Sequence, residues 1–295
     1  MENERISFYK GHGLGNDYIA LDLRDLPVYL SPPAIRLVCD RHTGVGSDGI
    51  LGRTDSESAD FGLRIFNPDG SEAEKSGNGL RIFAAYLLGS GEVAVGTPFT
   101  VETPGGTVGM TVLEESADGV ILVRAEMGTA SFRSTAVGLR GPDREAQDEL
   151  LELEAGDRVA IHTVSIGNPH CVVFVDELDP EDLRRRAPQI CAHPDFARGT
   201  NVQFARSTEP GVVDALVWER GAGETSASGS SACAVAAAAV RAGMVAERTV
   251  QVRMPGGSLQ VEVRDDWSLV LLGPVEGVYR GELTAGMIAR LRELQ

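Results

Sequence analysis

Lysine is almost absent from this chain of 295 residues, and basic side chains as a whole are scarce. Lys10 and Lys75 are the only lysines, and 27 Lys and Arg stand against 43 Asp and Glu, which gives a formal net charge of −16. Binding to a phosphate backbone requires clustered Lys and Arg. We therefore expect no nucleic-acid partner.

Long apolar runs are also lacking. The longest examples, such as Ala232 to Val240, fall far short of the roughly 20 residues that a membrane span requires. Residues 1–5 are polar and charged, without the apolar core of a secretory leader. These observations predict no membrane partner and a cytoplasmic enzyme.

Cysteine is sparse, and its four occurrences show no Cys-x-x-Cys spacing. This pattern indicates neither a zinc site nor a disulfide framework, so no metal is expected. Cys171 lies in an apolar run and Cys233 in an alanine-rich one, and we expect both to be buried, unreactive thiols. The remaining two are Cys39 and Cys191.

The chain does contain an internal repeat with an offset of 152 residues. One copy runs from Asn67 to Arg81 and the other from Glu219 to Cys233. In each, a serine follows a Glu by four positions and is itself followed by Gly and an alanine-rich apolar run. Because similarity at a fixed offset over a long stretch reports architecture, the repeat predicts two similar domains and one active site built from two half-sites.

Two further pairs extend the repeat. Gly15-Asn16 recurs as Gly167-Asn168 at the same offset. The sequence Thr103-Pro-Gly-Gly106 recurs as Met254-Pro-Gly-Gly257, one residue out of step, and taken alone this pair is better interpreted as two turns that happen to look alike. With 42% hydrophobic residues the chain can bury more than one core, which agrees with two domains.

The pattern of apolar and glycine residues predicts similar elements in both halves. The apolar residues of the two predicted helices are too continuous for a surface helix, so we expect each half to be strands around one buried helix. The acidic, polar segment 140–160 is the predicted connection. Strands are expected over 6–10, 18–23, 63–66, 163–166, 171–175 and 215–218, and helices over 79–88 and 230–242.

The two predicted helices start at equivalent serines, Ser76 and Ser228. The first backbone N–H groups of a helix are unpaired and carry the positive end of its dipole, which attracts an anion. Two such helix starts facing each other could hold an α-carboxylate and stabilise charge on the adjacent carbon. The alternative is that both serines are ordinary N-caps, but their relation by an internal repeat favours an anion site.

Seven motifs, in this order, resemble those of diaminopimelate epimerases over nearly the whole chain. They are Gly13-Leu-Gly-Asn-Asp17, Arg41-His-Thr-Gly-Val-Gly-Ser-Asp48, Asn67-Pro-Asp-Gly-Ser71, Ser76-Gly-Asn-Gly79, Gly167-Asn-Pro-His170, Thr200-Asn-Val202 and Glu219-Arg-Gly-Ala-Gly-Glu-Thr225. A proline-racemase-like enzyme shares the two-domain plan, but it explains the Glu219-Arg220 and Gly-Asn-Pro-His motifs less well.

The resemblance implies an isomerase that interconverts LL- and meso-diaminopimelate without a cofactor, in the synthesis of lysine and peptidoglycan precursors. One base removes the α-proton while a conjugate acid supplies a proton on the opposite face. The implied fold is α/β (α+β), with two pseudo-symmetric domains, each a strongly curved, mostly antiparallel sheet around a central helix, and an interdomain cleft. We expect domains at 1–118 plus 275–295 and at 119–274; the sequence allows a homodimer.

The resemblance also assigns roles to residues of the matching motifs. Catalytic positions fall at Ser76 and Ser228, with His170 and Glu219 as supporting polar groups beside the reacting centre. Arg220 would pair with the distal carboxylate of the amino-acid substrate, which suits a bidentate fork. An asparagine in a loop is otherwise usually a turn former, and His170 after Pro169 is alternatively a structural histidine. The remaining substrate-binding positions are Asn16, Asn67, Asn168 and Asn201 for side-chain hydrogen bonds, and Gly77, Asn78, Gly229 and Ser230 for the α-carboxylate.

The chain departs from the family at the two acid/base positions, where the family has cysteines and this sequence has Ser76 and Ser228. A thiol has a pKa of about 8.5, whereas a hydroxyl treated as water-like is a weaker acid by roughly seven pKa units. At about 1.4 kcal/mol per pKa unit the difference is of order 10 kcal/mol, as an upper bound. Epimerisation by two thiols should therefore be severely impaired.

Three interpretations remain open. The chain is a diaminopimelate epimerase whose cysteines were replaced, which traps substrate without turnover. Alternatively it is a natural relative that acts on another amino acid or uses another base, such as Glu219 or His170 through water; the replacement of a usual glycine by Ser231 agrees with this. The third interpretation is a non-catalytic amino-acid-binding protein that keeps the carboxylate pocket.

Overall fold

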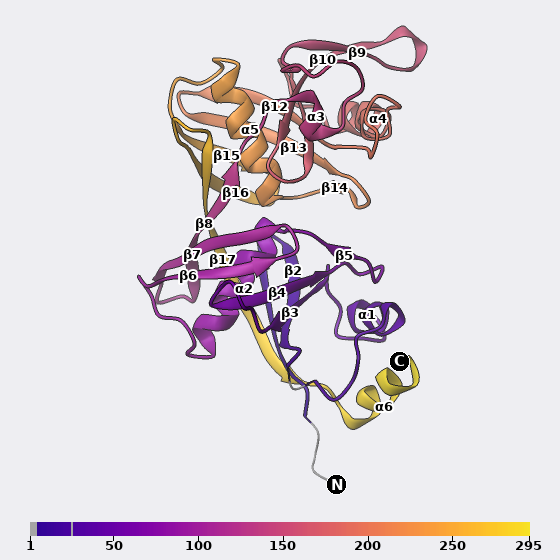
Figure 1. Cartoon of the computed structure of the whole chain (residues 1–295), viewed down its shortest axis with the longest axis vertical. Coiled ribbons are helices and arrows are strands. Elements are labelled where there is room, and N and C mark those ends of the chain that lie inside the picture. The colour runs from indigo at the N-terminus through magenta and orange to yellow at the C-terminus, as the bar shows by residue number, and fades with distance from the viewer. Residues whose placement is uncertain (1–4, 25) are drawn as a thin grey trace. The chain divides into compact units, whose positions relative to one another are not determined.

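A computed structural model describes residues 5–24 and 26–295 of the chain. The described residues divide into two compact units (Figure 1). Unit 1 comprises the residues up to Ala125 together with Gly273–Gln295, and unit 2 comprises Glu126–Leu272. The prediction that the polar residues 1–5 do not form a secretory leader concerns mostly residues 1–4, which lie outside the described part.

Unit 1 is built of strands with one central and two peripheral helices. Its elements are β1 (Ser7–Gly13), β2 (Asn16–Asp22), α1 (Pro32–Cys39), β3 (Ile50–Thr54), β4 (Phe61–Phe66), β5 (Glu72–Ala73), α2 (Gly77–Gly89), β6 (Pro98–Thr103), β7 (Gly106–Glu115), β8 (Val120–Thr129), the last part of β17 (Ser268–Glu282) and α6 (Ala285–Glu293).

Unit 2 follows the same plan with additional short elements at its start. They are α3 (Ser134–Val137), β9 (Glu149–Glu152), the 3-10 turn η1 (Glu154–Gly156), β10 (Arg158–Ser165), β11 (Pro169–Phe174), α4 (Pro180–Cys191), β12 (Asn201–Glu209), β13 (Val212–Glu219), β14 (Gly223–Thr225), α5 (Gly229–Arg241), β15 (Thr249–Met254), β16 (Gly257–Val263) and the first part of β17.

The strands of the two units repeat the same order of pairings. In unit 1, β1 pairs with β2 antiparallel, β2 with β3 parallel, β3 with β4 antiparallel, β4 with β6 parallel, and β6 with β7 antiparallel. In unit 2 the same order of directions joins β10, β11, β12, β13, β15 and β16. The expected pseudo-symmetric α/β fold with mostly antiparallel sheets is therefore confirmed.

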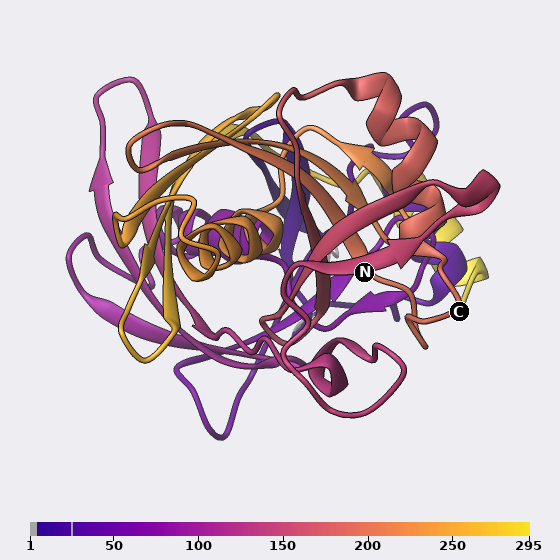
Figure 2. The ribbon, with the colours of Figure 1, turned by 90° about the horizontal axis from the view of Figure 1, so that it is seen from above.

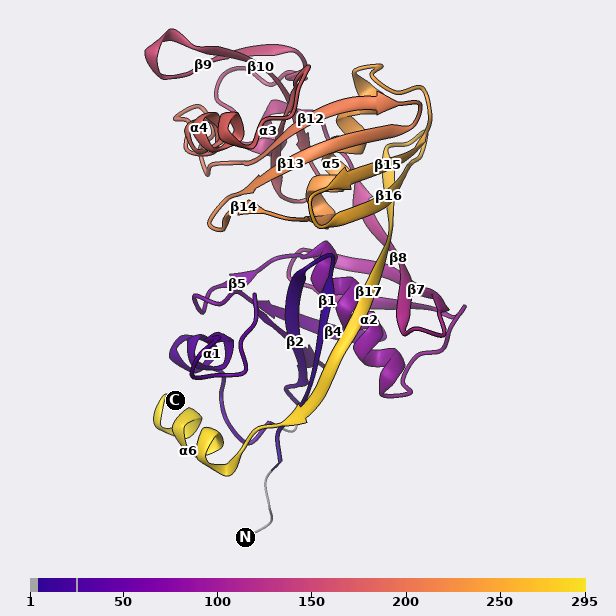
Figure 3. The same cartoon turned by 180° about the vertical axis from the view of Figure 1, so that it is seen from behind.

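Strands β8 and β17 each begin in one unit and end in the other. The first part of β17, Leu269 to Leu272, pairs with β16, and its last part, Glu276 to Glu282, pairs with β1; Figure 3 shows it as one continuous strand. The prediction that segment 140–160 connects the domains is wrong, because this segment lies inside unit 2 and contains β9, η1 and the start of β10. Its acidic, polar residues belong to these elements and to the loops between them.

Each unit has one helix buried on nearly every side, as the continuous apolar pattern predicts. Helix α5 is in contact with β10, β11, β12, β13, β15 and β16, and Figure 2 shows it inside the strands of its own unit. Its alanines at 232, 234 and 236–239 have no exposed surface. Small side chains on all faces let the surrounding strands pack directly against the helix at the density of a protein interior.

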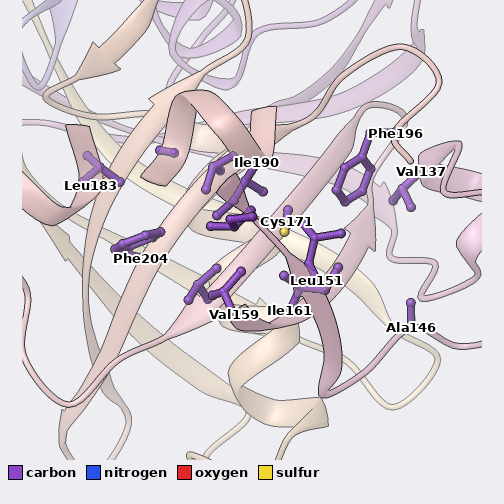
Figure 4. Close-up of a cluster of buried hydrophobic side chains, with 14 of the residues drawn as sticks. Val137, Ala146, Leu151, Val159, Ile161, Cys171, Leu183, Ile190, Phe196 and Phe204 are labelled. Atoms are coloured by element: carbon purple, nitrogen blue, oxygen red, sulfur yellow. The ribbon is translucent and has the colours of Figure 1, made fainter. Parts of the chain in front are cut away.

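Each unit also has a hydrophobic cluster that lies under its peripheral helices. In unit 2, Leu183 and Ile190 of α4 pack with Phe204 of β12 and Cys171 of β11 (Figure 4). In unit 1 the corresponding cluster joins α1 and α6 to strands β1 to β3.

The expectation that Cys171 and Cys233 are buried thiols is confirmed, since both are fully buried. Burial raises the pKa of the Cys171 thiol well above its ordinary value. Within residues 5–24 and 26–295, no helix combines the length and the apolar character that a membrane crossing needs.

Candidate active site

The two central helices start with the same capping geometry. Ser76 has φ −140° and ψ 120°, and Ser228 has φ −146° and ψ 125°. Each serine side chain accepts a hydrogen bond from the backbone N–H three residues later, at 3.0 Å from Gly79 and 3.4 Å from Ser231. The predicted repeat is thus present in the backbone, and both serines are N-caps as well as candidates for an anion site.

The two Pro-Gly-Gly turns support these helix starts. They form the β6–β7 and β15–β16 hairpin turns, and Gly105 N donates to Glu74 O at 2.9 Å while Gly256 N donates to Ser226 O at 2.8 Å. Glu74 and Ser226 each lie two residues before the capping serine. The interpretation of these turns as chance look-alikes is therefore wrong, because they hold equivalent places in the repeat.

Ser76 of unit 1 is half-buried at the start of α2. Its Oγ lies 3.4 Å from the hydroxyl of Tyr18, a residue of β2 that the sequence did not single out. A side chain at position 79 would meet the Ser76 Cβ and Oγ at 3.2 Å, so glycine there leaves room for the serine.

Asn16 and Asn78 meet behind Ser76. Asn16 begins β2 after a turn in which Leu14 and Gly15 both adopt positive φ, and its Oδ1 accepts from Asn78 Nδ2 at 3.1 Å. Asn78, only 3% exposed, accepts in turn from Arg81 Nη2 at 2.9 Å. The Asn16 Nδ2 donates to Asp48 Oδ2 at 2.9 Å.

Asn67 occupies a turn directly after β4. Its backbone N–H donates to Ser71 O at 2.8 Å and its Nδ2 donates to Ser71 Oγ at 2.9 Å. In unit 1 this residue therefore acts as a turn former, which is one of the two roles considered for it.

Ser228 of unit 2 is paired with a carboxylate. Its Oγ donates to Glu219 Oε1 at 2.7 Å and lies 3.3 Å from Ser230 Oγ. Burial raises the pKa of Glu219, and the hydrogen bond from Ser228 partly opposes this effect. Glu219 is thus a hydrogen-bond acceptor for the group at position 228, and its raised pKa makes its carboxylate a stronger base.

His170 is fully buried and uses both ring nitrogens within unit 2. Gln203 Nε2, which can only donate, lies 3.1 Å from His170 Nδ1, so His170 Nε2 carries the hydrogen that is donated to Asn168 Oδ1 at 3.0 Å. Gln203 Nε2 also donates to Ser231 Oγ at 3.0 Å. Burial lowers the pKa of His170 to about 3, so the ring is neutral at physiological pH.

Asn201 and Arg220 are joined at the end of β13. Asn201 Oδ1 accepts from Arg220 N at 2.9 Å, and Asn201 Nδ2 donates to Pro169 O at 3.1 Å. The exposed side chain of Arg220 donates from Nη1 to Arg198 O at 2.7 Å. Its guanidinium keeps further N–H groups for an anion.

The structure gathers most of the predicted residues into two half-sites. Around the start of α2 lie Ser76, Gly77, Asn78 and Asn16, whereas Asn67 forms its hydrogen bonds within its own turn. Around the start of α5 lie Ser228, Gly229, Ser230 and Glu219. Gln203 bridges Ser231 to the pair Asn168–His170, and Arg220, which follows Glu219 in the chain, donates to Asn201. The sequence missed Asp48, Arg81 and Gln203, although Asp48 closes one of the seven motifs. Within the described residues no group of three or more His, Cys, Asp or Glu could hold a metal ion.

Two solved structures of other proteins share the fold of this chain. A hydroxyproline epimerase from Agrobacterium vitis, 16% identical, aligns with a TM-score of 0.69 over 95% of this chain and 91% of its own. A predicted epimerase from Pseudomonas aeruginosa, 19% identical, aligns with a TM-score of 0.67 over 96% and 100%. The chain has the two-repeat fold of these proteins, with a capped helix start in each repeat.

Sequence comparison narrows the class to one family. The family model described as diaminopimelate epimerase matches residues 8–133 and 162–278. A relative from Nostoc sp. named diaminopimelate epimerase 2 is 43% identical over 96% of this chain and 98% of its own length, and a diaminopimelate epimerase from Desulforudis audaxviator is 42% identical over 94% and 99%. This chain belongs to the diaminopimelate epimerase family.

Proposed function

We propose that the chain acts on diaminopimelate as an epimerase of this family, interconverting the LL and meso forms through proton removal on one face of the α-carbon and proton delivery on the other. The observation that carries the proposal is the pair of equivalent helix starts, at Ser76 and Ser228, in a chain that belongs to the family. Each capped helix start presents backbone N–H groups that lack an intrahelical acceptor, which suits a carboxylate.

The substrate contacts follow the motifs. Gly77, Asn78, Gly229 and Ser230 receive the α-carboxylate, and Arg220 receives the distal carboxylate through the N–H groups that Arg198 does not use. Side-chain hydrogen bonds to the substrate come from Asn16, Asn67, Asn168 and Asn201.

The two acid/base positions are chemically unequal in this chain. Ser228 has Glu219 as a hydrogen-bonded acceptor, whereas the polar side chain found near Ser76 Oγ is the phenol of Tyr18. A hydroxyl remains a far weaker acid than a thiol, by roughly seven pKa units. We therefore propose that the chain binds its substrate but turns it over very slowly, and that proton transfer is more impaired at Ser76 than at Ser228.

His170 acts in this proposal as a supporting group rather than as a base that works through water. Its Nδ1 already accepts from Gln203 and its Nε2 donates to Asn168. A neutral ring with both nitrogens engaged orients Asn168 for the substrate.

The reaction requires no cofactor in this proposal, because the helix starts and the two proton donors supply the chemistry. We also propose a cytoplasmic location, in the synthesis of lysine and cell-wall precursors, and no nucleic-acid partner, which agrees with the net charge of −16. Assembly as a homodimer is compatible with the proposal and is not required by it.

The test compares the chain as given with the Ser76→Cys/Ser228→Cys variant in deuterated water containing LL-diaminopimelate. We expect α-deuterium, measured by mass spectrometry, only with the double variant, because its thiols restore the acid/base pair. A variant with Ser90→Cys and Ser207→Cys is the matched control, since it adds two thiols away from both helix starts and should incorporate none.

The other outcomes separate the alternatives. Rapid incorporation by the chain as given would show that another base replaces the thiols, and it would refute slow turnover. Binding is followed by thermal shift with diaminopimelate, lysine and proline. Because Arg220 needs a distal anion, diaminopimelate should bind more tightly than lysine; equal affinities would refute the role of Arg220, and no response to diaminopimelate would refute the function.

A further inference from the structure

The motif from Arg41 to Asp48 has no role in the function proposed above, although Asp48 accepts a hydrogen bond from the side chain of Asn16. Asp48 precedes β3, and its Oδ2 accepts from Asn16 Nδ2 at 2.9 Å and from Asp17 N at 3.2 Å. Its Oδ1 accepts from Arg41 Nη2 at 2.7 Å. Asp48 thus holds both the side chain of Asn16 and the backbone directly after it.

A second carboxylate keeps Arg41 in place. Asp17 Oδ1 accepts from Arg41 Nη2 at 2.7 Å, and Asp17 Oδ2 lies 2.8 Å from Lys10 Nζ. Burial opposes the ionisation of Asp17, but the hydrogen bonds from Arg41 and Lys10 outweigh it and hold the pKa of Asp17 at about 2. The two carboxylates and two cations therefore form one ionic cluster beside Asn16.

A cation lies at the other end of the same hydrogen-bond chain. Arg81, in the second turn of α2, is fully buried and donates from Nη1 to Gly77 O at 3.0 Å and from Nη2 to Asn78 Oδ1 at 2.9 Å. An added Cβ at Gly13 would lie 3.1 Å from Arg81 Nη2, so the absence of a side chain there leaves space for the guanidinium. The chain of bonds runs from Arg81 through Asn78 and Asn16 to Asp48.

The charged groups at the two ends of this hydrogen-bond chain fix the direction of every hydrogen bond in it. A guanidinium can only donate, so Asn78 must turn its oxygen to Arg81, and a carboxylate can only accept, so Asn16 must turn its nitrogen to Asp48. The central bond, from Asn78 Nδ2 to Asn16 Oδ1, is the one that satisfies both conditions. Reversing either amide would place two donors or two acceptors against each other.

This direction decides what Asn16 can offer a ligand. One Nδ2 hydrogen goes to Asp48, and the second is available to an acceptor such as a carboxylate oxygen. We propose that Asp48 and Arg81 are positioning residues that hold the Asn16 amide with its N–H toward a carboxylate of the amino-acid ligand. The identity of the ligand rests on the function proposed above, whereas the orientation of the amide does not.

The equivalent positions of unit 2 do not repeat this hydrogen-bond chain from Arg81 to Asp48. At the positions 152 residues further along, Asp48, Asn78 and Arg81 are replaced by Thr200, Ser230 and Cys233. In unit 2 the amide of Asn168 is oriented by neutral His170 instead. The amide of Asn16 is therefore oriented by charged groups, and the amide of Asn168 is oriented by an uncharged ring.

The test is Asp48→Asn in the full chain. The new amide can donate as well as accept, so it no longer dictates the direction of the Asn16 amide. In protein labelled with 15N at asparagine, the side-chain signals of Asn16, identified by their loss in Asn16→Gln, should move. Diaminopimelate should bind at least about tenfold more weakly, since a hydrogen bond to a charged group contributes about 1.5–3 kcal/mol.

Two comparisons separate orientation from loss of stability. Asp22→Asn removes a half-buried carboxylate at the other end of β2, where it pairs with Arg24 and Arg53, and should change the Kd less than about twofold. Arg81→Lys keeps a group that only donates and should retain binding better than Arg81→Gln. Melting temperatures of all variants record the stability losses.

The proposal is overturned if Asp48→Asn leaves the Asn16 signals in place, or if Asp22→Asn weakens binding as much as Asp48→Asn does. A parent chain that binds no diaminopimelate would instead refute the proposed function and the carboxylate ligand. The Asn16 signals would then still decide whether Asp48 orients the amide.

Discussion

At the residue scale, His170 illustrates how burial changes the meaning of a motif. The sequence Gly-Asn-Pro-His identified it correctly as part of the family pattern, but a sequence does not reveal that Gln203, on the neighbouring strand, faces one ring nitrogen. Ser76 and Ser228 were found from the sequence because their offset repeats. Asp48, Arg81 and Gln203 were missed because their roles depend on partners brought together only by strand pairing and helix packing.

The lowered pKa of His170 predicts a specific acid response. Because its folded-state pKa is about 3 and its ordinary value is about 6.5, the unfolded chain binds the extra proton between these values, and stability falls as the pH drops through that window. At pH 4.5 this contribution is of order 2–3 kcal/mol. In His170→Gln the loss of stability between pH 6.5 and 4.5, measured by urea unfolding, should be shallower than in the parent.

The control is His42→Gln, which changes an exposed histidine. Its pH dependence should follow that of the parent. An unchanged slope in His170→Gln would contradict a neutral, buried His170. The comparison uses slopes, because replacing a buried side chain lowers stability at every pH.

At the scale of elements, the sequence predicted the buried helices and several strands, but it misjudged the connection between the domains. The helices were predictable because the apolar residues of α2 and α5 follow one another too continuously for a surface helix. Segment 140–160 has the polar, acidic composition of a linker, yet it holds β9 and a loop bonded to unit 2: Ser134 N donates to Arg144 O at 2.7 Å and Thr163 N donates to Ala146 O at 2.9 Å. Composition does not distinguish such a loop from a linker.

The close packing around α5 predicts a large penalty for added volume. Ala236 has no exposed surface, so Ala236→Leu should force shifts in the surrounding strands and destabilise the protein by about 1–3 kcal/mol. Urea unfolding measures the change. Ala242→Leu, at the exposed C-terminal end of the same helix, is the control and should alter stability by less than about 0.5 kcal/mol; equal effects would mean that α5 is loosely packed.

At the scale of the whole molecule, the repeat was readable from the sequence, whereas the exchange of strand ends was not. The last part of β17 pairs with β1, which lies 264 to 275 residues earlier in the chain, and only the pairing of Ser7 with Glu282 and His12 with Glu276 reveals it. Local patterns predict strands, but they do not predict which strand lies beside which.

Shortening the chain should therefore affect the units unequally. A chain that ends at Leu272 lacks the part of β17 that pairs with β1 and all of α6, so unit 1 should lose its cooperative unfolding transition. Both tryptophans, Trp218 and Trp267, lie in unit 2, so tryptophan fluorescence should still show a transition while far-UV circular dichroism loses part of its amplitude.

A chain that ends at Glu282 keeps the β1 partner and lacks only α6 and the adjoining end. It should retain both transitions, with unit 1 destabilised by the loss of buried Ile288 and Leu291, which contribute about 2–5 kcal/mol each by large-to-small standards. Identical behaviour of the two shortened chains would contradict the importance of the β17 pairing.

The hairpin contacts at Glu74 and Ser226 have a further consequence for how the fold can change. Each capping serine, Ser76 or Ser228, is anchored by a hairpin turn bonded two residues upstream of it as well as by the helix that follows. Mutational drift at the distal ends of α2 and α5, around Ser90 and Ala242, can then accumulate without displacing the hydroxyls. The fold should therefore tolerate substitutions best at the positions that lie farthest from Ser76 and Ser228.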